Sequence, residues 1–262
     1  MEIVGYIASL FIGISLGLIG GGGSILTVPV LVYLFAISPP LAISYSLFIV
    51  GLTSLVGAYN NYRKGLVDFK TAFLFGSSSI TTVFIFRKFI IPHLPNVFFT
   101  MGSFQVTQSF FVMVMFALLM VAASTSMIRS KNIEVEGTKA SSPMLLIFYG
   151  VLIGLITGFL GAGGGFLLIP ALVLLMKLPM RKAIGTSLLI IALNSLIGFL
   201  GDIGRHPIDW KFISIVSLIA ITGIFIGGHF NQKIDSRKLK KGFGWFVLVM
   251  GIYILIKETV LK

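Results

Sequence analysis

Residues Gly17–Pro29 read GLIGGGGSILTVP, with four consecutive glycines inside an apolar run. Glycine destabilises a helix interior by roughly 1 kcal/mol relative to alanine, so four in a row interrupt an α-helix. A second such run, GFLGAGGGFLLIP, occupies Gly158–Pro170. The same helix-breaking pattern therefore occurs twice in one chain.

The composition identifies the solvent of this chain as a lipid bilayer. The mean hydropathy is +1.05, and 56% of the residues are hydrophobic while only 11% are charged, which is outside the range of soluble domains. Backbone groups in lipid must satisfy their own hydrogen bonds, so long apolar segments predict helices. We expect an all-α polytopic membrane protein with ten apolar segments: Ile3–Ile19, Ile25–Ile37, Leu41–Tyr59, Phe69–Phe86, Phe104–Ile128, Met144–Leu160, Phe166–Met176, Ala183–Leu200, Trp210–Phe230 and Phe243–Ile256.

The positively charged residues of the chain are expected to interact with lipid headgroups rather than with nucleic acid. The formal net charge is +12, but the lysines and arginines are predicted to lie between the apolar spans or at their ends, as Lys70 and Lys211 do, where they contact anionic headgroups. No basic surface domain exists to carry nucleic acid. The absence of cysteine excludes disulfides and thiol chemistry. The N-terminal MEIVGYIASLF lacks the basic region of a secretory signal, so we expect the first segment to stay as a helix.

The two glycine runs belong to an internal repeat. A shift of 141 residues aligns Gly17–Lys70 with Gly158–Lys211 without a gap, and 20 of the 54 aligned positions are identical. Many transporters consist of two such halves. We therefore predict a first transmembrane repeat at 1–128, a polar linker at 129–143 and a second transmembrane repeat at 144–262.

The two apolar segments beside each glycine run leave the topology with two alternatives. In the first half, Ile3–Ile19 spans about 26 Å as a helix and Ile25–Ile37 about 20 Å. The pair is either a re-entrant hairpin, which makes the halves inverted, or one broken crossing, which makes them parallel. Inverted halves gather 14 of the 20 basic residues on one face, whereas parallel halves divide them ten against ten. The positive-inside rule favours inverted halves in the plasma membrane, with the linker in the cytoplasm.

The glycine runs are candidate anion sites. Breaking a helix leaves unpaired N–H groups at the start of the next helix, and glycine lets an anion approach that backbone. We expect both runs to be non-helical and to face each other near the bilayer midplane. The alternative is that the glycines serve close helix packing alone. The candidate residues are Gly20, Gly21, Gly22, Gly23, Ser24, Gly161, Gly163, Gly164 and Gly165.

The third apolar segment of each half adds neutral polar side chains along one helical face. Ser46, Thr53, Gly57 and Asn60 share this face in the first half. Such donors suit an anion that must also leave, although hydrogen bonding between helices is the alternative explanation. The matching face of the second half holds Ser187, Asn194, Gly198 and Gly201.

Other chemistry finds no support in the pattern. Asp68 and Asp209 each precede an aromatic residue at the start of a segment, which predicts N-caps. The three histidines are scattered without metal-ligand spacing. The glycine runs lack the Lys-Ser/Thr of a P-loop and the last glycine of a dinucleotide motif. We expect no enzyme, metal or cofactor.

The second half also carries RKAIGTSLLIIALNSLIGFLGD at Arg181–Asp202, followed by IDWK at Ile208–Lys211. With the two glycine runs and their prolines, these stretches resemble the TauE/SafE family of sulfite and sulfonate exporters over essentially the full length. The family's Ala-x-Gly-Thr-Ser pattern falls on Ala183, Gly185, Thr186 and Ser187, which adds Thr186 to the candidate site. The first half has Ser44 and Tyr45 where Gly185 and Thr186 stand. The resemblance implies transport of small sulfur oxyanions or organosulfonates.

Two hypotheses from different classes remain. The chain is either a secondary transporter of small anions or a non-transporting membrane scaffold or accessory subunit. The short loops and the missing soluble domain favour the transporter, since a scaffold needs surface for partners. The expected partners are a small anionic substrate and membrane lipids, and a homo-oligomer is compatible with the sequence.

Overall fold

The computed structural model describes residues 2–95, 97–101, 104–129, 143–161, 163–230 and 236–260. The predicted linker, apart from its end residues Arg129 and Pro143, lies outside these ranges. In chain order the elements are α1 (Glu2–Ile19), η1 (Gly21–Leu26), α2 (Thr27–Tyr33), α3 (Pro39–Arg63), α4 (Phe69–Ile85), η2 (Phe86–Ile90), η3 (Ile91–His93), β1 (Val97–Met101), β2 (Phe104–Thr107), α5 (Gln108–Arg129), α6 (Pro143–Leu160), α7 (Gly165–Leu175), α8 (Met180–Asp202), α9 (Trp210–Phe230) and α10 (Ser236–Thr259).

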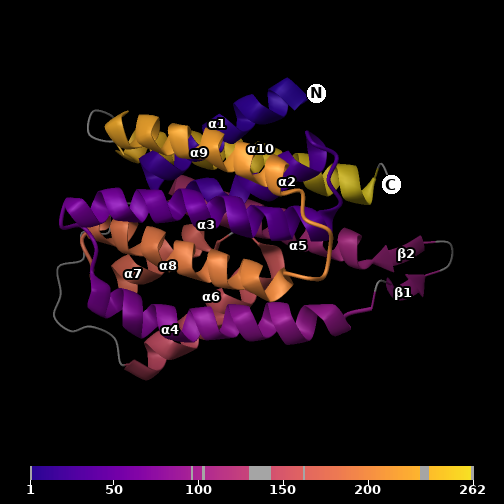
Figure 1. Ribbon diagram of the computed structural model, residues 1–262, viewed down its shortest axis with the longest axis horizontal. Helices are drawn as coiled ribbons and strands as arrows, with labels where there is room; N and C mark the ends of the chain where they lie inside the picture. Colours follow the sequence, from indigo (N-terminus) through magenta and orange to yellow (C-terminus); the bar gives the residue numbers. More distant parts are fainter. Residues whose placement is uncertain are drawn as a thin grey trace.

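The prediction of an all-α polytopic membrane protein is confirmed. Within the described ranges, six helices are long and apolar enough to cross a membrane. In each half a pair of helices joined at the glycines precedes three long helices (Figure 1). The long helices are Pro39–Arg63, Phe69–His93 and Gln108–Arg129 in the first half, and Met180–Asp202, Trp210–Phe230 and Lys241–Thr259 in the second.

The first pair of helices, α1 and α2, forms a hairpin rather than one broken crossing. Gly5, near the start of α1, lies directly against the ring of Phe35, just beyond the end of α2. The Tyr6 and Phe35 rings also meet edge to face, with centroids 5.3 Å apart. The chain therefore returns to the end of the molecule from which it started.

The two halves exchange helices rather than packing as separate bundles. Helix α1 packs along α9 of the other half, and α6 packs along α4. Helix α3 packs against α8, and α5 against α10. The contacts recur in the register of the repeat: Gly20 lies against Ile184 and Gly161 against Ile43, Gly13 against Ala220 and Gly154 against Ser79, and Gly57 against Leu188 and Gly198 against Leu47.

The central pair of helices, α3 and α8, runs antiparallel (Figure 1). Near the start of α3, Ser44 contacts Asp202 at the end of α8. Near the end of α3, Asn61 contacts Gly185 in the second turn of α8. Antiparallel packing of two equivalent helices is the pattern that inverted halves require.

A short β-hairpin before α5 differs from the sequence prediction. The apolar run Phe104–Ile128 was expected to be one helix, but β2 takes up Phe104–Thr107 and pairs antiparallel with β1. The start of this run, Phe-Gln-Val-Thr, is rich in strand formers. The hydroxyl of Thr107 then accepts a hydrogen bond from the Phe110 N–H at 3.2 Å, which helps to set the start of α5.

Candidate functional site

The first glycine run is largely helical, so the expectation of a non-helical run is wrong for most of it. Helix α1 ends at Ile19, and Gly20 adopts φ 75° and ψ −138°. Gly21, Gly22 and Gly23 then begin a 3₁₀ helix. A tighter helix tolerates glycine at its start because only the turn at Gly20 needs a positive φ.

The second glycine run is an open turn, as expected. Gly161, Gly163 and Gly164 all have positive φ, between 65° and 67°. Helix α7 starts at the next residue, Gly165. Left-handed backbone at three positions is accessible to glycine and strains other residues, which explains the composition of this run.

The two runs face each other, as the sequence analysis expected. The backbones of Gly21 and Gly165 are in direct contact, and a Cβ on either would overlap the Cα of the other. Gly21 and Gly163 both lie against Ile191, in the middle of α8. Close packing therefore accounts for Gly21 and Gly165, while the conformation of the second run needs its other glycines independently.

Most of the predicted polar donors make hydrogen bonds within the protein. Ser46 joins the second run directly, because its hydroxyl donates to the carbonyl of Gly161 at 2.8 Å. Three of the other four hydroxyls bond to the backbone of their own helix: Ser24 to Gly21 O, Thr53 to Ile49 O and Ser187 to Ile184 O.

Thr186 ties the central helix of one half to a loop of the other. Its hydroxyl accepts a hydrogen bond from the Asp68 N–H at 2.9 Å. In the matching contact, the hydroxyl of Tyr45 accepts from the Asp209 N–H at 2.8 Å. Both aspartates are N-caps, as predicted: Asp68 accepts from Thr71 N–H, and Asp209 accepts from Phe212 N–H.

Polar groups without partners gather at the second glycine run. The hydroxyls of Ser195 and Thr157 are fully buried and have no hydrogen-bond partner among the described residues. Ser195 lies beside Gly163, and Thr157 lies against Gly164. Buried polar groups are normally hydrogen-bonded, so two unpaired hydroxyls beside one glycine run indicate a place where a ligand or a water molecule binds.

Asn194 lies next to Ser195 in α8 and also has unused hydrogen-bonding capacity. Its amide nitrogen donates to the hydroxyl of Ser79 at 2.7 Å, while its Oδ1 has no partner within the described ranges. Turning the amide over preserves the contact with Ser79 and frees two N–H donors. This observation extends the sequence prediction from Asn194 to Ser195 and Thr157, which the sequence analysis did not single out.

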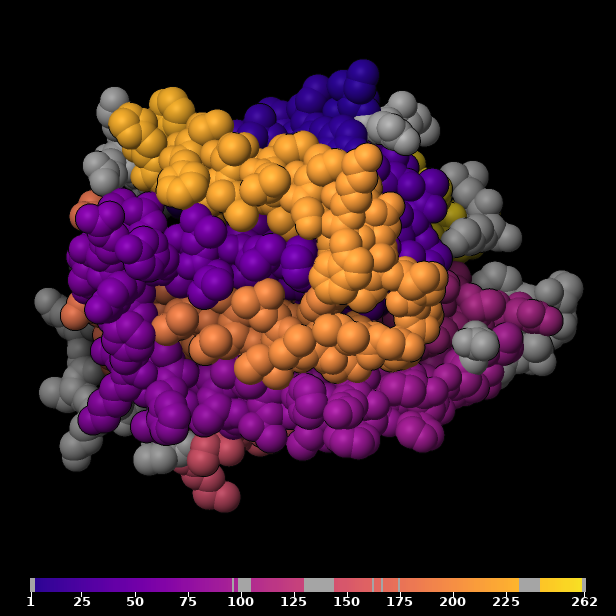
Figure 2. Space-filling model, in the orientation of Figure 1, coloured from indigo at the N-terminus to yellow at the C-terminus, as the bar shows by residue number. Residues whose placement is uncertain are grey.

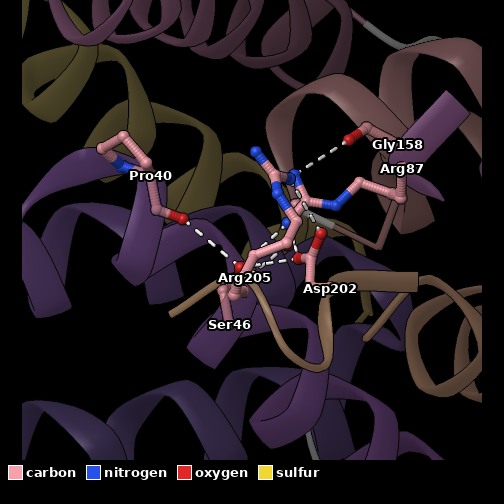
Figure 3. A network of polar contacts seen from close by, with 8 residues as sticks. Pro40, Ser46, Arg87, Gly158, Asp202 and Arg205 are labelled. Atoms are coloured by element: carbon pink, nitrogen blue, oxygen red, sulfur yellow. Dashed lines mark hydrogen bonds and ion pairs between the residues drawn. The ribbon is translucent and has the colours of Figure 1, made fainter. Parts of the chain in front are cut away.

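A buried ion pair between Arg87 and Asp202 is the second polar centre (Figure 3). Their side chains are 3% and 2% exposed. Arg87 also donates to Ser44 Oγ at 3.0 Å and to the Gly158 carbonyl at 3.4 Å, whereas its Nε has no partner in the described part of the chain. Asp202 further accepts from Ser44 Oγ at 2.6 Å and pairs with Arg205 at 3.2 Å.

Arg87 corrects the prediction that the basic residues lie between the apolar spans or at their ends. It belongs to η2, which continues α4, so the apolar helix runs from Phe69 to His93 without ending at Phe86. The apolar residues Phe89, Ile90 and Ile91 beyond the arginine were the available sequence signal. The partner of Arg87 is 115 positions away, which no local pattern indicates.

A cavity opens beside this ion pair, with about 340 Å³ of empty space that includes open solvent. Arg87, Arg205 and His206 contribute to its wall. Partial burial lowers the pKa of Arg205, and burial together with the charges of Arg205 and Arg87 lowers the pKa of His206. The lowered pKa favours the neutral form of the His206 imidazole, so the local charge comes mainly from the two arginines and Asp202.

The fold and these sites define a polytopic α-helical membrane protein of two related halves with buried polar centres between them. Residues 6–254 match the sulfite exporter TauE/SafE family, and the chain belongs to this family.

Curated relatives cover nearly the whole chain and are named as probable membrane transporter proteins. A protein of Xylella fastidiosa strain 9a5c is 29% identical and covers 93% of this chain and 91% of its own length. One of Methanocaldococcus jannaschii is 25% identical, with 97% and 94% covered. YunE of Bacillus subtilis is 26% identical, with 91% and 89% covered. No solved structure matches the chain. The chain is therefore a membrane transporter by family and by relatives.

Proposed function

We propose that this transporter is a secondary carrier of small anions, with sulfite or an organosulfonate as substrate, and that it has no enzymatic activity. The family's description and the anion-binding chemistry of the second glycine run support this substrate class. The observation that carries the proposal is the pair of buried hydroxyls of Ser195 and Thr157, which lie beside Gly163 and Gly164 and have no hydrogen-bond partner in the described part of the chain.

The substrate site lies at the second break, between α7 and the middle of α8. The oxygen atoms of the anion accept hydrogen bonds from Ser195, from Thr157 and from the Asn194 amide in its reversed orientation. Oxyanions bind well to several neutral donors. A central site without a fixed cation holds its anion weakly, which favours release on either side.

The first half does not reproduce this site, so its equivalent residues serve as a matched control for those of the second half. Ser54 is the counterpart of Ser195, is equally buried and likewise has no hydrogen-bond partner among the residues that the structure describes. However, the first-half counterpart of Gly163 is Gly22, whose nearest neighbours are Ile19 and Phe243 rather than Ser54. The hydroxyl of Ser54 therefore has no open glycine turn to act with.

The proposed topology has inverted halves in the plasma membrane with the linker in the cytoplasm. Antiparallel α3 and α8 place Arg63 and Lys64 at the same end of the molecule as Arg181 and Lys182. The positive-inside rule assigns this end to the cytoplasm. The charged cavity at Arg87 and Asp202 then lies at the opposite, external end.

Uptake of radiolabelled sulfite into proteoliposomes tests the function. Ser195→Ala is expected to lower flux about tenfold below saturation, because a hydrogen bond from a dry hydroxyl is lost. The matched variant Ser54→Ala is expected to stay within twofold of the wild type. Absence of sulfite and sulfonate flux in the folded wild type refutes the proposal in favour of a scaffold. Equal losses in both variants place the site elsewhere.

A further inference from the structure

The ion pair of Arg87 and Asp202 is not required by the fold, because the other half forms the same junction without it. The shift of 141 residues places Gly228 at the position of Arg87 and Asn61 at the position of Asp202. Gly17 is the counterpart of Gly158, whose carbonyl Arg87 contacts. The two halves therefore build equivalent junctions from very different side chains.

The counterpart junction also contains a cavity, and the described residues that line it are uncharged. Gly17, Asn60, Asn61 and Gly228 contribute to its wall, and its described lining includes no ionisable group. Lys64 is the counterpart of Arg205, but it is exposed and does not line the cavity. A buried pair costs several kcal/mol per ion in desolvation. Among the described residues the pair is present at one end only, so its cost calls for a role other than folding.

The charged cavity has one positive charge in excess. Arg87 and Arg205 carry two positive charges, and Asp202 carries one negative charge. The two arginines disfavour a further positive charge on His206, and the nearby Lys88 is exposed and lies over the rings of Phe84 and Phe89. A group with a single negative charge balances this cavity.

The donors at the cavity suit an oxyanion. The Nε–H of Arg87 is fully buried and unpartnered among the described residues. Arg205 uses one of its nitrogen atoms to pair with Asp202. Its side chain is 24% exposed, so its other donors are reachable from solvent. Gln108 and Ser109, at the start of α5, also line the cavity and offer neutral donors. Arginine donors bind planar or tetrahedral oxyanions through paired hydrogen bonds.

We propose that this cavity is a second anion site, which binds a small oxyanion with a single negative charge through Arg87 and Arg205. The α8–α9 loop, which crosses the start of α3 (Figure 2), contributes Arg205 and His206 to the wall of the site. The inference rests on the proposed function only for the sulfur chemistry of the anion. The site concentrates the anion at one end of the carrier, next to α6, which leads into the second glycine run. The described residues form no equivalent site at the opposite end.

Binding of methanesulfonate, a monovalent sulfonate, to the purified full chain tests this proposal by calorimetry in detergent. Arg205→Gln is expected to raise the Kd at least about tenfold, because a charged hydrogen bond is lost. Arg205→Lys retains the charge and is expected to recover part of the affinity. The matched control Lys211→Gln removes an exposed positive charge at the same end of the molecule and is expected to change the Kd less than twofold.

A second variant keeps the proposal open to refutation if Arg205→Gln alters the loop. Arg87→Met combined with Asp202→Asn removes both buried charges and is expected to raise the Kd similarly. Wild-type affinity in both variants, or no binding to the folded wild type, overturns the inference. The experiment separates the failure of this inference from the failure of the proposed function. If anion binding depends on Arg205 but the wild type shows no anion flux, the transport proposal is refuted and the second anion site stands. If flux depends on Ser195 but Arg205→Gln has unchanged affinity, the second anion site is refuted and the transport proposal stands.

Discussion

Removal of one member of the buried ion pair is expected to destabilise the protein more than removal of both. In Arg87→Met, Asp202 keeps the hydroxyl of Ser44 at 2.6 Å and Arg205 at 3.2 Å but loses its fully buried partner. Breaking a buried pair on one side costs about 3–5 kcal/mol. We expect the lower end of this range, about 3 kcal/mol, because two contacts remain.

The double variant Arg87→Met/Asp202→Asn leaves no buried charge without a partner. Replacing a whole buried pair by uncharged groups is often close to neutral, so we expect a loss within about 1 kcal/mol of the wild type. The coupling energy between the two positions is then about 2 kcal/mol or more.

Reversible unfolding in mixed detergent–SDS micelles, followed by circular dichroism, measures these free energies. Asn61→Ala, at the position that matches Asp202, is the control and is expected to cost about 1 kcal/mol, the value of its single hydrogen bond to Gly57 O. Additive losses in the cycle, or a loss under about 1 kcal/mol in Arg87→Met, refute the conclusion that the two charges are buried together.

Three further predictions concern packing, pH and topology. Gly165→Ala forces a Cβ into the backbone of the first glycine run and is expected to cost at least about 3 kcal/mol, whereas Gly242→Ala, in open space on α10, is expected to gain up to about 1 kcal/mol in the same unfolding assay. Because the pKa of His206 is lowered in the folded protein, the unfolded state binds its proton more readily. Stability is therefore expected to fall as the pH drops below about 6.5. His206→Gln is expected to reduce this dependence on pH in thermal melting. In intact cells, a single cysteine at Pro207 is expected to react with an impermeant maleimide while one at Lys64 does not, and the reverse result contradicts the proposed orientation.

Local patterns determined the architecture because the relevant physics is local. A hydrophobic run fixes its solvent and, through its own backbone hydrogen bonds, its helical form. The register of the repeat also follows from the sequence alone, and the contacts of Gly20 and Gly161 with Ile184 and Ile43 agree with it. The caps at Asp68 and Asp209 involve residues three positions apart, so they too were predictable.

The tertiary structure decided which polar groups are free and which charges are buried. Ser46 and Ser187 are identical in the repeat, yet one bonds to the glycine run of the other half and the other to its own helix. In the sequence Arg87 resembles a surface residue that flanks an apolar span. Only the fold brings Asp202 beside it, and a buried charge is tolerated only with such a partner. The neighbours of each glycine run likewise came only from the fold: Gly21 and Gly165 fill each other's space, while Gly163 and Gly164 lie against hydroxyls that have no partner among the described residues. The sequence by itself determined where the chain breaks, and only packing between the halves determined what each break contacts.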